Sequence, residues 1–174
     1  MGHTYREDVM VTTVVAGNPK PGSRTLEAAT RLAEALTGRS PDHVIDVIGL
    51  GSGLLGWGDE AVAAAVSTTA ASDLVVVASP TFKATYTGVL KLFLDQFATG
   101  DGLRDVTAVP LMLGGGPAHA LAPDLLLKPV LVELGATCPA PGLYLLDSSY
   151  TDDGRIAEYA DRWRGAVTAQ TTSV

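Results

Sequence analysis

The chain has 174 residues, a length that suggests one domain over residues 1–174. Hydrophobic residues make up 47% of the chain and aromatic residues only 6%, so we expect an aliphatic core. The net charge of −7 argues against a nucleic-acid partner, which would need a basic patch, and against binding to anionic membranes.

Two kinds of segment alternate along the chain. Short valine-rich apolar segments predict strands, in chain order over 9–16, 43–48, 73–79, 107–113 and 143–146. Segments with helical spacing of their apolar residues lie between and after them, over 24–36, 61–70, 86–97, 124–134 and 152–167. The terminal segments 1–8 and 168–174 are expected to fray.

Strands that alternate with helices indicate an α/β fold with a parallel sheet covered by helices on both faces. Five strands fit a flavodoxin-like, doubly wound sheet with strand order 2-1-3-4-5. Pro110 is awkward inside the fourth strand, because it cannot donate a ladder hydrogen bond. We expect either a bulge there or a position where the missing amide would face outward.

Ligands of such sheets bind beyond the carboxyl ends of the strands, where the strand order reverses. The first loop at this point, residues 17–25, leads into a helix, whose free amides and dipole favour an anion. It lacks the P-loop and Gly-x-Gly-x-x-Gly patterns, so a phosphate monoester is the better guess. A polar turn with Ser23 as a simple N-cap is the alternative. The candidate phosphate ligands are Asn18, Lys20, Ser23, Arg24 and Thr25.

The other two loops at this edge follow the third and fourth strands. In residues 79–88, Pro80 stiffens the backbone, while Phe82 and Tyr86 can flank a planar ring or simply be core aromatics. In residues 114–119, three glycines bring the backbone close to a ligand without steric cost, and His119 is either a ligand contact or a helix-start residue. The candidate residues in these loops are Pro80, Thr81, Phe82, Lys83, Gly114, Gly115, Gly116 and His119.

Residues of the common catalytic types do not occur at the sequence spacings that are typical of active sites. No nucleophile–base pair, histidine cluster or carboxylate pair is evident, so metal catalysis and acyl transfer lack their parts. The single cysteine, Cys138, excludes an internal disulfide, and we interpret it as a buried structural thiol. Hydride transfer, by contrast, is carried out by a cofactor, and the protein needs only to bind and orient that cofactor.

The three loops together resemble the NADPH-dependent FMN reductase family, and are most similar to the reductase components of two-component alkanesulfonate monooxygenases. The resemblance is carried by residues 17–25, 79–88 and 114–131 and spans about 9–150. It implies FMN and NADPH as cofactors, with the FMN phosphate in the first loop. It also implies isoalloxazine contacts from Pro80, Thr81, Phe82, Lys83, Gly114, Gly115 and His119.

The resemblance further implies a cytoplasmic homodimer or homotetramer that supplies reduced flavin to a partner monooxygenase. The chain departs from the family's usual serine at Asn18 and tyrosine at Phe82. Sulfonate-linked reductases often carry an aromatic residue where Leu125 stands, in a locally widened helix at the subunit interface. Leucine there suggests that FMN is held as a bound prosthetic group or that the assembly differs.

Two other functions remain open at this point. Bound FMN could instead reduce a quinone, an azo compound or a metal oxyanion. A non-enzymatic electron carrier of the flavodoxin type is less favoured, because the chain lacks the hydroxyl-rich Thr-x-Thr-Gly-x-Thr loop and is less acidic than such carriers usually are.

Overall fold

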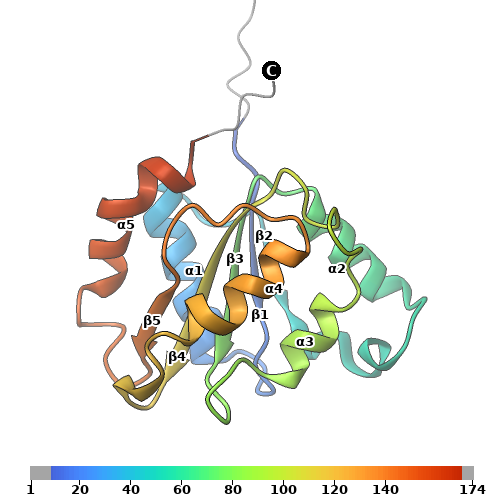
Figure 1. Ribbon diagram of the computed structural model, residues 1–174, viewed down its shortest axis with the longest axis horizontal. Coiled ribbons are helices and arrows are strands. Elements are labelled where there is room, and N and C mark those ends of the chain that lie inside the picture. The colour runs from blue at the N-terminus through green and yellow to red at the C-terminus, as the bar shows by residue number, and fades with distance from the viewer. Residues whose placement is uncertain (1–8, 170–174) are drawn as a thin grey trace, which may run out of the picture.

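The computed structural model describes residues 9–169, which form a single open sheet with helices packed against it (Figure 1). The five strands are all parallel, and their order is β2-β1-β3-β4-β5, which confirms the predicted topology. The strands are β1 (Thr12–Ala16), β2 (His43–Asp46), β3 (Leu74–Pro80), β4 (Thr107–Gly114) and β5 (Leu143–Leu146).

The helices cover both faces of the sheet. One face carries α1 (Arg24–Thr37) and α5 (Arg155–Val167), whose apolar residues pack with Val14, Val76 and Leu111 of the strands. The other face carries α2 (Glu60–Ala70), α3 (Gly88–Leu94) and α4 (Lys128–Glu133), which pack with Val15, Val77 and Met112 (Figure 1). The alternation of neighbouring strand residues between two apolar layers explains why the strands are hydrophobic nearly throughout.

Short helices of other types complete the chain. They are the 3₁₀ helices η1 (Val47–Leu55) and η2 (Pro117–His119) and the π-helix η3 (Pro123–Leu127). Sequence periodicity predicted neither 3₁₀ helix, and it assigned residues 47–48 of η1 to the second strand, which ends at Asp46. It included residues 124–127 of η3 in one regular helix, because an apolar pattern does not distinguish a π turn from an α turn. In the part of the chain that the structure describes, no helix has both the length and the apolar character to span a membrane.

Several predicted bounds need correction. The first strand begins at Thr12 rather than residue 9, because it pairs with β3 only from there. The predicted helix 86–97 is shorter, since Thr87 caps it and it ends at Leu94. The predicted helix 124–134 is divided into a π turn and α4, and the predicted helix 152–167 begins at Arg155. The segments predicted to fray, 1–8 and 168–174, lie outside the described residues except for 168–169.

Pro110 lies within an unbroken β4, where it pairs with Val77 of β3. The N–H of Ala108, two residues earlier, donates to the Thr137 carbonyl on the side of β5. By the alternation of a strand, the Pro110 nitrogen faces that same side, where pairing with β5 begins only at Leu111. The outward-facing alternative is therefore the right one, and no ladder hydrogen bond is lost.

Candidate functional site

A cavity of about 390 Å³ opens at the carboxyl ends of the strands, beside the β1–β3 switch point. This is the edge at which the sequence placed a ligand. Its walls come from the loop after β1, the first turn of α1, the end of β3 with the loop after it, the end of β4 and the residue after β5. The lining residues are Asn18, Lys20, Gly22, Ser23, Arg24, Thr25, Glu27, Pro80, Phe82, Leu113 and Asp147.

The loop after β1 is held in shape by its own side chains. Asn18 donates from Nδ2 to Thr25 Oγ1 over 3.0 Å, and its Oδ1 accepts the Lys20 N–H over 2.9 Å. Ser23 is the N-cap of α1, because its Oγ accepts the Leu26 N–H over 3.3 Å. The simple capping role is therefore present, and it leaves the proton of the Ser23 hydroxyl to donate to a bound anion.

The loop after β3 turns sharply before it reaches α3. Phe82 and Thr85 exchange backbone hydrogen bonds of 2.8 and 3.2 Å, and the two residues between them have positive φ, 52° at Lys83 and 71° at Ala84. This tight turn leaves Phe82 half exposed against the cavity, while Lys83 does not line it. Tyr86, the other predicted ring-flanking residue, packs against the core instead.

A buried network ties these two loops together. Thr87 donates its hydroxyl to the Gly17 carbonyl over 2.6 Å, and its own N–H donates to Ser79 Oγ over 3.0 Å. Ser79 in turn donates to the Pro80 carbonyl over 2.8 Å. Gly17 is required in this arrangement, because a Cβ there would collide with Leu90. The position of the first loop is therefore fixed by residues that follow β3.

The glycine loop after β4 is shaped by Tyr144 of β5. The Tyr144 hydroxyl donates to the Gly116 carbonyl over 2.7 Å, and a Cβ at Gly114 would collide with the same hydroxyl. A Cβ at Gly115 or Gly116 would meet only open space, so their backbone is open to a ligand. Neither these glycines nor Thr81 contributes to the cavity wall itself.

His119 lies apart from the main cavity. It lines a separate apolar hollow of about 480 Å³ with Ala84, Leu121 and Leu125, among others. The π-helix η3 places Leu125 with 66% of its surface exposed. A locally widened helix, as the resemblance implied, is thus present in this chain, with Leu125 on it.

The sequence prediction missed two carboxylates that line the cavity. Glu27 is held by Tyr150, whose hydroxyl donates over 2.8 Å, and by Arg31; these two contacts lower the pKa of Glu27. Asp147 lies beside Arg24, with 3.7 Å between the guanidinium and the carboxylate. Asp147 directly follows β5, and this position at the edge where parallel strands end was the one signal in the sequence that pointed to it.

Other chemistry has little support among the described residues. Within 9–169, no three His, Cys, Asp or Glu side chains come together as a metal site would require. Cys138 is half-buried rather than fully buried, and its burial raises the pKa of the thiol to about 11. A thiol that stays protonated at neutral pH is a poor nucleophile, which agrees with a structural role.

Comparison with protein families gives a match over most of the chain. The family model described as NADPH-dependent FMN reductase matches residues 10–151. An FMN reductase (NADPH) of Escherichia coli K12 is 37% identical over 91 residues, which cover 52% of this chain and 44% of that protein. The NADH-dependent FMN reductase SfnF of Pseudomonas putida is 32% identical, over 75% of this chain and 74% of its own length. The alignment thus spans less than half of the Escherichia coli protein.

Solved structures agree with these relatives. The apo form of an NADH:FMN oxidoreductase (EMOB) superposes with a TM-score of 0.82 at 30% identity, covering 93% of this chain and 92% of that chain. An oxidoreductase from Corynebacterium diphtheriae has a TM-score of 0.75 at 26% identity, covering 91% and 97%. The fold of this chain is therefore shared with two proteins described as oxidoreductases.

Proposed function

The chain belongs to the NADPH-dependent FMN reductase family, and from this premise we propose that it transfers hydride from a nicotinamide cofactor to FMN. The observation that carries the proposal is the cavity at the β1–β3 switch point. It combines a helix N-terminus, two basic side chains and an exposed aromatic ring in one space. FMN would there accept the hydride at its ring system, and the protein would bind and orient both molecules.

The residues present fit such a group. Lys20, Arg24 and the free amides of the first turn of α1 offer hydrogen-bond donors for a phosphate, with the hydroxyls of Ser23 and Thr25 beside them. Outside the cavity wall, beside Gly114, the buried Thr81 Oγ1 has no hydrogen-bond partner among the described residues. A polar edge of a ligand ring would supply one. The cavity volume of about 390 Å³ also lies within the usual range of cofactor sites.

The roles we assign follow from these positions. Asn18, Lys20, Ser23, Arg24 and Thr25 would hold the phosphate. Pro80, Thr81, Phe82 and Lys83, with Gly114, Gly115, Gly116 and His119, would contact the ring system or cover it. His119 lies in the neighbouring hollow, so its contact would need the ring to extend toward that side. The relatives are named for NADPH in one case and NADH in another, so the nicotinamide preference is left to experiment.

The test is steady-state NADPH oxidation by flavin-stripped protein with free FMN varied from none to saturating. We expect the rate to rise from near zero and saturate with FMN. If the FMN complex oxidises NADPH only when a quinone, an azo compound or a metal oxyanion is added, the physiological acceptor is that compound. If FMN binds and no acceptor gives turnover, the protein is an electron carrier and the proposal is wrong.

The phosphate assignment gives a mutational prediction. Ser23→Ala combined with Arg24→Ala removes a hydroxyl donor and a charged donor, so FMN binding should weaken by several kcal/mol at most, since each bond to a charged group contributes about 1.5–3 kcal/mol. Titration with FMN and with riboflavin measures the effect, which should be confined to FMN. Arg104→Ala, which removes a surface arginine outside this cavity, is the control. An unchanged FMN affinity in the double variant would remove this phosphate site.

The proposal extends to partners and location. We propose a homodimer or homotetramer that passes reduced flavin to a monooxygenase in the cytoplasm. The apolar hollows at η3 and between α3 and α4 support contact between copies of the chain. A coupled assay with a flavin-dependent monooxygenase tests the transfer, because the oxygenase turns over only if it receives reduced FMN. The absence of coupling with every such oxygenase tried would restrict the activity to flavin reduction alone.

A further inference from the structure

The cavity contains as many carboxylates as basic groups. Lys20 and Arg24 line it, and so do Glu27 and Asp147. The two acidic residues differ in their surroundings. Glu27 is already engaged by Arg31 over 2.7 Å and by the hydroxyl of Tyr150. The ion pair that the structure gives for the Asp147 carboxylate is with Arg24, a cavity residue placed to meet an incoming anion.

Arg24 is held by Asp147 in two ways. Its Nη1 donates to the Asp147 carbonyl over 3.1 Å, and its Nη2 lies 3.7 Å from the carboxylate oxygen Oδ2. The Asp147 N–H, in turn, donates to the Gly114 carbonyl over 3.0 Å, which fixes this residue at the sheet edge. The backbone contacts therefore hold Arg24 and Asp147 together whether or not the carboxylate is charged.

We propose that the Asp147 carboxylate is an internal competitor of the flavin phosphate for the Arg24 guanidinium, and so limits how tightly FMN is held. This inference rests on the proposed function. The side chains are 63% exposed at Arg24 and 36% exposed at Asp147, so their ion pair is weak and a phosphate displaces it readily. After displacement the carboxylate remains close to the phosphate, and the like charges repel each other.

The consequence is a site that recognises phosphate but releases it easily. A reductase that supplies flavin to another protein needs such release, whereas an electron carrier does not. The competition acts only on the phosphate end, so it should affect FMN and leave riboflavin, which has no phosphate, unchanged. This difference separates competition from a general effect of the residue on the fold of the site.

The experiment measures the dissociation constants of FMN and riboflavin by quenching of flavin fluorescence, without nicotinamide. Asp147→Asn should tighten FMN binding about two- to fivefold, the range expected for an exposed ion pair, and leave riboflavin binding unchanged. Asp101→Asn is the matched control, since Asp101 forms an ion pair of the same 3.7 Å length with Arg104 outside this cavity. The gain should disappear when Asp147→Asn is combined with Arg24→Ala.

Each other result overturns the inference. Weaker FMN binding in Asp147→Asn would mean that the carboxylate positions Arg24 for the phosphate. No change, or an equal change for riboflavin or in Asp101→Asn, would mean that no competition exists. If the unaltered protein turns over NADPH with FMN but Asp147→Asn has no effect, only this inference fails. If the unaltered protein binds no FMN at all, the proposed function fails with it.

Discussion

One hydroxyl group, that of Tyr144, sets the path of the glycine loop. It is 6% exposed, it donates to the Gly116 carbonyl, and it occupies the space that a side chain at Gly114 would need. The loop therefore stays close to β5 although Gly115 and Gly116 have no side chains with which to pack. The binding of a ligand ring against this backbone would therefore depend on Tyr144, although the ring would not contact Tyr144.

Tyr144→Phe should loosen this loop without changing its packing. The loss of one hydrogen bond is expected to lower the free energy of unfolding by about 1 kcal/mol. Both FMN and riboflavin should bind more weakly, and by the same factor, because the change affects the ring end of the site. Urea unfolding and flavin titration measure the two effects. An effect on FMN alone would contradict the role, since it would place Tyr144 at the phosphate end.

At the residue level, the sequence predicts which residues lie close together where a strand end fixes their position. Asn18, Ser23, Arg24, Pro80 and Phe82 line one cavity because they follow two neighbouring strands of a parallel sheet. His119 lies in a separate hollow because η2 and the glycine loop carry it away from the strand end, and no periodic pattern reports such a turn. Asp147 was missed because a lone aspartate after a four-residue strand gives no distinctive spacing.

At the scale of elements, one residue, Thr87, both begins α3 and holds the first loop of the site in place. Thr87 is 3% exposed and caps this helix, since its Oγ1 accepts the Leu90 N–H over 3.1 Å while donating to Gly17. Sequence periodicity extended the helix to residue 86, because the tight turn before Thr87 has no apolar pattern of its own. The strand order was predictable in full, whereas helix ends set by such side-chain contacts were not.

Thr87→Val replaces the hydroxyl by a methyl group of similar size and leaves two buried polar groups, the Gly17 carbonyl and the Leu90 N–H, without partners. The free energy of unfolding should fall by about 2 kcal/mol. FMN affinity should fall as well, because the loops after β1 and β3 are no longer tied together. Thr87→Ser, which keeps the hydroxyl, is the control and should stay close to the unaltered protein. Equal losses in the two variants would mean that the methyl group, not the hydroxyl, stabilises this junction.

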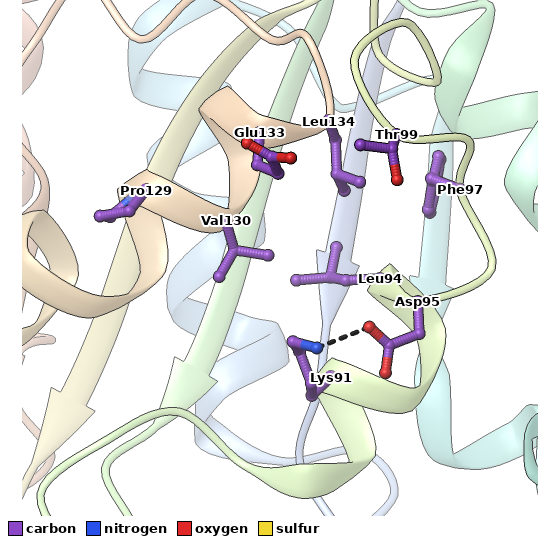
Figure 2. A pocket seen from close by; sticks show the side chains of 9 residues that line it. All are labelled: Lys91, Leu94, Asp95, Phe97, Thr99, Pro129, Val130, Glu133 and Leu134. Atoms are coloured by element: carbon purple, nitrogen blue, oxygen red, sulfur yellow. Dashed lines mark hydrogen bonds and ion pairs between the residues drawn. The ribbon is translucent and has the colours of Figure 1, made fainter.

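For the whole molecule, only 18% of the residues are charged, and exposed apolar side chains gather on the surface near η3 and α4. Leu121 and Leu125 are each 66% exposed beside one apolar hollow. A second hollow of about 340 Å³ lies between α3 and α4, with Leu94 and Val130 on its walls and the Lys91–Asp95 ion pair at its edge (Figure 2). Exposed apolar groups this close together favour contact with another protein surface, and we expect a second copy of the chain to cover the hollows at η3 and α4.

Leu125→Glu tests this assembly. An unpaired carboxylate placed in an apolar interface cannot be solvated there, so the variant should dissociate toward a monomer of 17.9 kDa, while the unaltered protein sediments as a dimer or tetramer. Leu55→Glu is the matched control, because Leu55 is a leucine with 76% of its surface exposed that lines neither hollow. The circular dichroism of the Leu125→Glu protein should be unchanged, since Leu125 is exposed within the chain. If the unaltered protein is a monomer, no such assembly exists. If only Leu55→Glu dissociates, the assembly surface lies elsewhere. In either case the exposed leucines of η3 would contact another partner.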